Sequence, residues 1–427
     1  MSEKLTIEGF AGIEHVEIDL RKINILIGPQ ATGKSIVAKL LYYFGGFVSE
    51  LLYVACAGET ETKLEGNLLR KFNQFFPPAA LGNRGFALLY HCGPWHFRIG
   101  RPDACDKAGH LELRCSEPFA DAFSRLTDEA KSVLNAGNGV PANEKLGTPG
   151  IYRRFARQLA ENGTPEMFLS EVFLPAARSS FTSVSPNLYT LTAAGASIDP
   201  FLLALGQSYE RARLALQRGD RGGPEEAKAT VAEIEQLVDD ILGAKYVLRG
   251  DLNFLVFEDG RVVDIGHTSS AQQEFFPLGI ILSDLPFFRS PGNGKRLFVE
   301  EPEAHLFPTT QRLVVELLAT LFNSDPERYR LVVTTHSPYV LTSLNNLLQA
   351  GQLAEELAGD EDALKRLCEE VPRSRHLLPR DVGAWYLDGK TARSIISEEE
   401  GLIEADEIDS VSYDLAVQFD RILDIGG

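Results

Sequence analysis

The chain has 427 residues, of which 44% are hydrophobic and 24% are charged, and its formal net charge is −18 at pH 7. This length is enough for two or more domains, and the composition is typical of an ordinary soluble globular protein. The acidic balance disfavours binding of nucleic acid over the whole surface, although a local basic groove stays compatible with it.

No apolar run approaches the roughly 18 residues that a membrane helix needs, and residues 1–4 lead directly into a strand-like segment without a signal-peptide core. The 5 cysteines are scattered and never spaced as Cys-x-x-Cys, which predicts reduced thiols and argues against a zinc hook or a disulfide framework. We therefore expect a cytoplasmic protein without a membrane partner.

The N-terminal region predicts two short strands, 5–10 and 15–20, and then an apolar strand at 23–27. A glycine-rich turn follows this strand and opens a helix at 36–44. A helix start offers free N–H groups and a partly positive dipole, and both attract phosphate. The spacing Gly-x₄-Gly-Lys-Ser predicts a nucleoside triphosphate site, with Lys34 reaching the β- and γ-phosphates and Ser35 holding a magnesium ion. The alternative is an ordinary glycine-rich turn before a helix.

The predicted ATP-binding residues are consecutive: Gly28, Pro29, Gln30, Ala31, Thr32, Gly33, Lys34, Ser35 and Ile36.

The middle of the chain predicts a helical piece at 68–76, paired strands at 86–91 and 95–99, and then helices at 116–134, 151–161, 201–217 and 225–241. A small antiparallel meander is expected over 245–265, with its tightest turn at Asp259-Gly260. No heptad pattern runs on long enough to predict a long coiled coil.

The second half alternates helices at 275–282 and 310–321 with buried strands at 296–299 and 329–335. Acidic helical material at 353–370, a hairpin-like segment at 384–389 and a closing helix at 410–423 complete the chain. Alternating helices and apolar strands predict an α/β fold with a mostly parallel sheet, together with an antiparallel β subdomain and an inserted helical subdomain.

We expect four parts: an N-terminal ATPase lobe (1–115), a helical insertion (116–243), a C-terminal ATPase lobe (244–350) and an extension (351–427).

Three polar side chains follow the two late strands, where open α/β sheets place their ligands. Glu300 is predicted to hold the magnesium ion, and Glu301 to orient or deprotonate the attacking water. His336 is predicted to contact the γ-phosphate. The alternatives are two ordinary surface acids before a proline and a histidine that only hydrogen-bonds in the core.

A polar segment opens the helix at 275–282, and its simplest interpretation is a capping box that only starts this helix. The functional interpretation offers its hydroxyl and amide groups to the γ-phosphate of a nucleotide held by another subunit. The residues are Ser269, Ser270, Ala271, Gln272, Gln273 and Glu274.

The order of these motifs resembles that of ABC-type ATPase heads, most of all the stand-alone bacterial AAA-family ATPases related to the SMC and OLD groups. The resemblance spans residues 5–347, and 381–425 are also similar to that group. It implies that 28–35 is Walker A, 269–274 the signature, Glu300 the Walker B acid, Glu301 the catalytic glutamate and His336 the switch histidine.

Residues 174–179 are similar to a Pro-Ala-x-Arg-Ser element of these ATPases, which implies a Q-loop-like role for Arg178; the alternative is a plain strand-to-loop turn. Two positions depart from the family pattern: Ala271 replaces the usual glycine, and Glu300 stands where aspartate is commoner. Neither change removes a donor or a charge, but slow turnover is compatible with both.

The resemblance implies ATP and Mg²⁺ as cofactors and a head-to-tail homodimer, or a higher oligomer, with ATP in the interface. It also implies a regulatory ATPase of bacterial antiphage defence, acting on a separate nuclease or toxin, because only about 90 residues follow His336. The rival interpretations are an SMC-like DNA-repair head, a transporter ATPase and a small-molecule kinase.

Overall fold

The computed structural model describes most of the chain, and every structural statement below concerns these residues. They are 3–82, 84–102, 111–135, 154–159, 165–176, 178–179, 181, 198–218, 225–250, 252–287, 294–404, 417–419 and 421–422.

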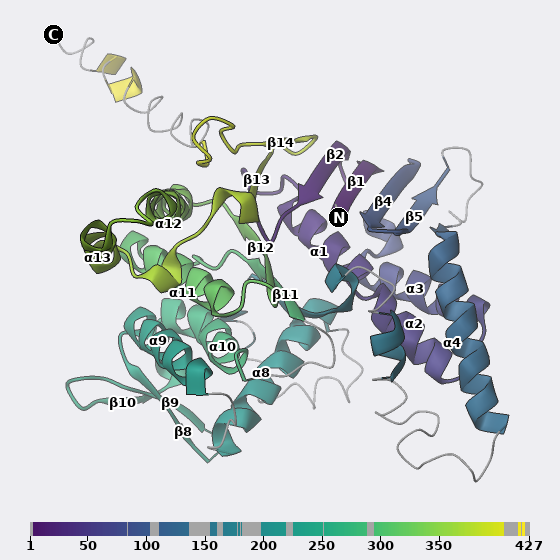
Figure 1. Ribbon diagram of the computed structural model, residues 1–427, viewed down its shortest axis with the longest axis horizontal. Helices are drawn as coiled ribbons and strands as arrows, with labels where there is room; N and C mark the ends of the chain where they lie inside the picture. Colours follow the sequence, from purple (N-terminus) through teal and green to yellow (C-terminus); the bar gives the residue numbers. More distant parts are fainter. Residues whose placement is uncertain are drawn as a thin grey trace.

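A six-stranded sheet forms the centre of the molecule, with the strand order β14-β13-β3-β12-β11-β7 (Figure 1). The five strands from β13 to β7 run parallel to one another, and only β14 is antiparallel. The strand bounds are β3 Ile23–Ile27, β7 Leu169–Leu174, β11 Gly294–Glu300, β12 Tyr329–Thr335, β13 Val382–Leu387 and β14 Ala392–Ser394.

Both faces of this sheet are buried, which explains why its strands are continuously apolar instead of alternating. Phe298 and Val332 face the core that contains helix α1 (Lys34–Gly45). Their neighbours Leu297 and Leu331 face the opposite core, which contains helix α11 (Pro308–Ser324). The sequence pattern therefore places one helical layer on each side of the sheet.

The N-terminal lobe contains a five-stranded antiparallel sheet in the order β2-β1-β4-β5-β6, with α1 to α4 packed beside it (Figure 1). Aromatic side chains fill its core, including a stacked pair of Phe44 and Tyr90 with ring centroids 5.1 Å apart. Its further elements are β1 Glu3–Phe10, β2 Ile13–Leu20, α2 Phe47–Cys56, α3 Glu61–Phe75, β4 Phe86–Cys92, β5 Trp95–Arg101, β6 Glu112–Cys115 and α4 Glu117–Asn135.

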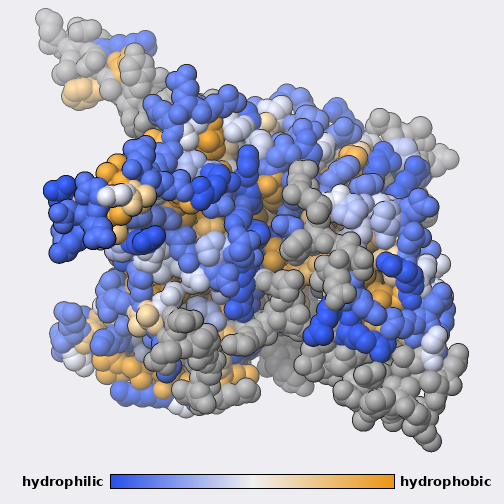
Figure 2. Space-filling model, viewed as in Figure 1, coloured by the Kyte–Doolittle hydropathy of each residue, from blue (hydrophilic) through white to orange (hydrophobic). Residues whose placement is uncertain are grey.

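The remaining helices cover the other side of the central sheet, and a three-stranded antiparallel sheet lies at their edge (Figure 1). Leu252 and Val262 of this small sheet are exposed, and apolar colour gathers over it in Figure 2 on an otherwise mostly hydrophilic face. The elements are α8 Pro200–Arg218, α9 Glu225–Leu242, β8 Lys245–Arg249, β9 Leu252–Val256, β10 Val262–Asp264, α10 Ser270–Asp284, α12 Pro338–Glu356 and α13 Glu361–Glu370.

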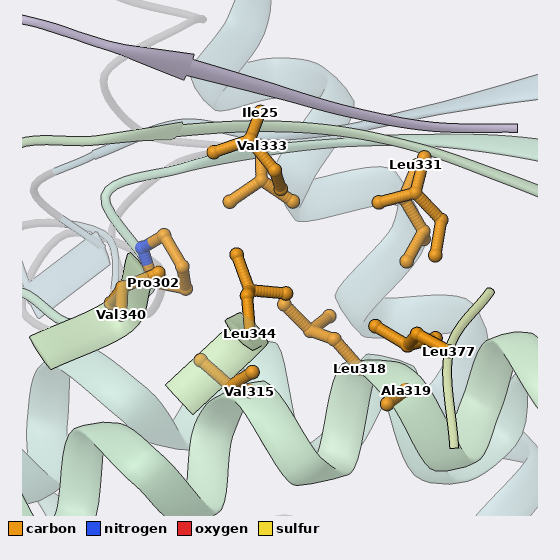
Figure 3. A pocket seen from close by; sticks show the side chains of 11 residues that line it. Ile25, Pro302, Val315, Leu318, Ala319, Leu331, Val333, Val340, Leu344 and Leu377 are labelled. Atoms are coloured by element: carbon orange, nitrogen blue, oxygen red, sulfur yellow. The ribbon is translucent and has the colours of Figure 1, made fainter. Parts of the chain in front are cut away.

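A small apolar cavity of about 20 Å³ lies between the central sheet and helices α11 and α12. Figure 3 shows Ile25 and Val333 of the sheet above it, Leu318 and Leu344 of the helices below it, and Pro302 at one end. A void of this size holds at most one water, and its lining offers no polar partner. We interpret it as a packing defect of the core.

One helical stretch, Lys34–Cys56, is long and apolar enough to cross a membrane by length and composition alone. This stretch consists of α1 and α2, and 67% of its apolar window is buried inside the protein. The stretch departs from the expectation of no membrane-length apolar run, and burial in the N-terminal core accounts for its apolar character.

Two strands differ from the expected division of the chain. β7 lies in the expected helical insertion but pairs with β11, and β13 lies in the expected extension but pairs with β3. The central sheet therefore takes strands from all four expected parts, because parallel pairing joins segments that are distant along the chain. The expected helices at 151–161 and 410–423 lie only partly within the described residues.

Candidate functional site

The carboxyl ends of four parallel strands meet at one edge of the central sheet. Ile27 at the end of β3 pairs with Thr335 at the end of β12, and Thr334 pairs with Glu300 at the end of β11. The end of β7 lies in register beside them, with Leu174 opposite Val299. The glycine-rich turn, the paired glutamates, the histidine and the Arg178 loop therefore all leave the sheet at this edge, where open α/β sheets bind ligands.

The glycine-rich turn between β3 and α1 has an unusual backbone. Gly28 and Gly33 have φ angles of 150° and 95°, and Ala31 has a φ of 61°. A Cβ atom on Gly28 would lie only 2.1 Å from the carbonyl oxygen of Leu387 at the end of β13. Glycine at 28 is therefore required by the neighbouring strand as well as by the turn.

The Lys34 side chain is buried and folds back over the turn. Its Nζ donates hydrogen bonds to the carbonyl oxygens of Gly28 (2.7 Å) and Pro29 (2.6 Å). Burial lowers the pKa of Lys34, while the nearby carboxylates of Glu301 and Glu303 raise it. The ammonium group thus lies at the first turn of α1, beside the free helix N–H groups that attract phosphate.

Glu300 is a buried carboxylate whose Oε1 atom has no hydrogen-bond partner within the described structure. Burial raises its pKa, and a hydrogen bond with the Ser35 side chain and the nearby Lys39 ammonium lower it. A buried carboxylate oxygen without a hydrogen-bond partner is energetically unfavourable. Next to a hydroxyl group it is suited to bind Mg²⁺, because proteins hold this ion with one or two carboxylates together with substrate phosphates. The predicted metal ligands Ser35 and Glu300 therefore lie together and fit the ion.

Glu301 follows at the edge of the site with a φ of 43°, a left-handed conformation that is rare for a residue other than glycine. Such strain costs on the order of 1–3 kcal/mol and persists only where the surroundings enforce it. Its N–H donates to the Thr334 carbonyl oxygen at 2.9 Å, and its Oε1 lies 3.8 Å from Nδ1 of His336. The conformation turns the carboxylate of Glu301 toward the histidine.

His336 is partly exposed and lies between two carboxylates. Its Nδ1 is 3.7 Å from Oε1 of Glu303, and its backbone N–H donates to the same oxygen at 3.1 Å. Glu303 is buried and was not among the predicted site residues. Its position two residues after Glu301 is only a weak indication of a role in the site. Nothing in the sequence shows that Glu303 forms hydrogen bonds with the end of a different strand.

The segment 269–274 forms both halves of a capping box at the start of α10. The Ser269 Oγ accepts from the Gln272 N–H at 3.3 Å, and the Gln272 Oε1 accepts from the Ser269 N–H at 3.1 Å. The Gln273 side chain donates to the Thr268 carbonyl oxygen at 2.9 Å. Ser269 and Ser270 are exposed and Ala271 is half-buried, so this end of the segment faces outward.

Glu274 points the opposite way and is fully buried. Its carboxylate accepts hydrogen bonds from the backbone N–H groups of Arg178 and Ser179, both at 2.8 Å. Arg178, also fully buried, lies 3.3 Å from the same carboxylate through its NH2 group. The structure therefore brings the last residue of the predicted signature to Arg178.

The strand order, the glycine-rich turn and the acids at the sheet edge fit the predicted α/β fold of a P-loop NTPase. Residues 170–342 match the family model described as "AAA domain, putative AbiEii toxin, Type IV TA system". This part of the chain is thus similar to an AAA domain, which agrees with the predicted class of ATPase. The search of curated proteins finds no match.

Several solved structures are similar to this chain at low identity. An SmcHead bound to the C-winged helix domain of ScpA is 11% identical, with a TM-score of 0.44 and coverage of 94% of this chain and 99% of that one. The SMC head domain from Thermotoga maritima is 12% identical, with a TM-score of 0.34 and coverage of 80% and 91%. An Smc head domain derived from Pyrococcus furiosus, bound to the C-terminal domain of ScpA, is 12% identical, with a TM-score of 0.37 and coverage of 97% and 99%.

Proposed function

We propose that this chain binds ATP with Mg²⁺ and hydrolyses it to ADP and phosphate. The observation that supports this most directly is the buried Glu300 carboxylate, with one unpaired oxygen, beside Ser35 at the start of α1. The other carboxylate oxygen, Oε2, accepts from the Ala176 N–H at 3.4 Å, so Oε1 is the atom left to bind a nucleotide-bound cation.

The roles follow from position. The first N–H groups of α1 and the Lys34 ammonium bind the β- and γ-phosphates, and Ser35 and Glu300 hold the ion. When bound, Mg²⁺ neutralises the charge that develops on the phosphate oxygens. Glu301 orients the attacking water and accepts its proton, and His336, 3.8 Å from Glu301, donates a hydrogen bond to the γ-phosphate.

Steady-state hydrolysis tests this proposal. Glu301→Gln should reduce turnover by about 100-fold or more while nucleotide binding is retained, because only the acceptor of the water proton is removed. Lys34→Ala should abolish binding of a fluorescent ATP analogue. An unchanged rate in both variants would contradict the proposed site.

We propose further that two copies associate head to tail, so that Ser269 and Ser270 of one copy contact the γ-phosphate held by the other. Exposure of both serines at the free N–H end of α10 supports this arrangement. Light scattering of the Glu301→Gln variant with ATP should give a dimer, or a higher oligomer, that dissociates without nucleotide. A monomer under all conditions would exclude the arrangement.

The proposed biological role is that of a cytoplasmic regulatory ATPase in bacterial antiphage defence, acting on a separate nuclease or toxin. This role is inferred from the order of the motifs; the family description itself names a putative toxin of a type IV toxin–antitoxin system. Expression with the neighbouring genes should lower phage plaque counts, and Lys34→Ala should restore them. A DNA-stimulated ATPase rate without any effect on plaques would favour the alternative, an SMC-like DNA-repair head.

A further inference from the structure

Arg178 is fully buried, and its guanidinium group contacts three separate segments. NH1 donates to the Pro175 carbonyl oxygen of its own loop (2.9 Å) and to the Glu300 carbonyl oxygen at the end of β11 (2.7 Å). NH2 donates to the Glu301 carbonyl oxygen (3.0 Å), and Nε donates to the Glu274 carbonyl oxygen in α10 (3.1 Å). The Arg178 side chain thus connects the loop after β7 with Glu300 and Glu301 and with helix α10, which we call the signature helix because the predicted signature lies at its start.

The bond to Glu301 falls at the strained residue of the site. With a φ of 43°, Glu301 needs surroundings that hold its backbone in place. Its N–H donates to the Thr334 carbonyl oxygen on β12, and its own carbonyl oxygen accepts from Arg178 and from the Ala304 N–H, both at 3.0 Å. Loss of the Arg178 bond would leave this carbonyl oxygen with the Ala304 N–H alone and would loosen the backbone that directs the Glu301 carboxylate.

The contacts between Arg178 and Glu274 connect the Arg178 loop to helix α10. Glu274 lies one turn inside α10, whose first residues Ser269 and Ser270 are exposed. A helix moves as a rigid unit over such a short length, so a displacement of its exposed start moves Glu274 as well. The Glu274 carboxylate forms an ion pair with the Arg178 guanidinium and accepts hydrogen bonds from two backbone N–H groups of the Arg178 loop. A movement of Glu274 therefore moves Arg178 as well.

We propose that Arg178 is a positioning residue that couples the signature helix to Glu301, so that contact of Ser269 and Ser270 with a second subunit's nucleotide sets the orientation of the hydrolytic carboxylate. This inference rests on the proposed ATPase function and adds a mechanism by which dimerisation controls turnover. The coupling path is short: Glu274, Arg178 and the backbone of Glu301, with every contact at 3.3 Å or less.

The test compares Arg178→Lys with the same substitution at another buried, ion-paired arginine that lies outside the site. Arg296 of β11 is also buried, and its NH1 lies 2.7 Å from Glu3, so Arg296→Lys removes a comparable guanidinium without touching the site. We expect both variants to lower the melting temperature by similar amounts. Only Arg178→Lys should lower kcat, by about 30-fold, while the affinity for a fluorescent ATP analogue stays within about threefold.

A milder variant keeps the test decisive if Arg178→Lys fails to fold. Glu274→Gln preserves the shape of the side chain and should also lower kcat, by about tenfold, without weakening nucleotide binding. The double variant should be no slower than Arg178→Lys alone, because both substitutions break one path. Equal loss of kcat in Arg178→Lys and Arg296→Lys, or normal kcat in Glu274→Gln, would overturn the inference. An inactive parent protein would instead refute the proposed function itself.

Discussion

The Oε1 atom of Glu303 accepts hydrogen bonds from the Thr335 hydroxyl (2.5 Å) and from the His336 backbone N–H (3.1 Å). This buried carboxylate thus joins the segment after β11 to the end of β12. Its contacts fix the backbone from which the His336 side chain projects toward Glu301. The orientation of the histidine therefore depends on an acid that lies outside the predicted site residues.

Removal of the hydroxyl that bonds Glu303 should loosen this arrangement. We expect Thr335→Val to lower kcat by about tenfold with little change in nucleotide affinity, because a buried charged acceptor loses a donor. Thr335→Ser keeps the hydroxyl and serves as the matched control, with a rate near that of the parent. Similar rates in the Val and Ser variants would show that the bond does not position His336.

Replacement of Glu300 by glutamine should have opposite effects on stability and on activity. Burial raises its pKa, so in the absence of nucleotide its contribution to stability is present at low pH and is lost as pH rises through the folded-state pKa. Without ligand, Glu300→Gln should therefore raise the melting temperature, by an amount that grows as the pH rises above the usual pKa range of a carboxyl group. The same variant should lose Mg²⁺-dependent hydrolysis. A lower melting temperature at pH 8 would contradict the unpaired carboxylate.

Glu171 on β7 offers a second pH-dependent test, away from the phosphates. Both of its carboxylate oxygens are buried without a hydrogen-bond partner within the described structure, and burial raises its pKa to about 8. Stability should fall as pH rises from its unfolded-state pKa to about 8. We expect the free energy of unfolding of Glu171→Gln, relative to that of the parent protein, to increase by about 2 kcal/mol between pH 6 and 8.5. Urea unfolding at both pH values measures this, and a constant difference would refute it.

Gly28→Ala should damage both stability and nucleotide binding. The added Cβ would lie 2.1 Å from the Leu387 carbonyl oxygen, and backbone atoms cannot yield as a flexible side chain can. We expect a loss of about 3 kcal/mol in the free energy of unfolding and weaker ATP binding. Gly82→Ala is a suitable control, since it also has a positive φ, of 62°, but no neighbouring atom within 4 Å. Equal losses in both variants would attribute the effect to the φ angle alone.

Motif spacing predicted the loop at 28–35, the acids after β11 and the histidine after β12, because each follows an apolar strand whose end is visible in the sequence. The strand register then explains why they meet. Glu303 and the Leu387 contact could not be predicted, since both depend on pairing between distant segments. For the same reason the expected division of the chain leaves β7 and β13 outside the ATPase lobes. The inward direction of Glu274 depends on the rotation of α10, which a capping-box pattern does not specify.

Strand β3 leads into the glycine-rich turn, yet both of its neighbours, β12 and β13, come more than 300 residues later in the chain. During synthesis on the ribosome this apolar strand has no partner on either edge until most of the polypeptide has emerged. Such distant pairings slow folding, because loop closure precedes the gain from contact. In a newly made chain this apolar strand is therefore exposed to aggregation for a long time, and the demand for chaperones should be correspondingly high.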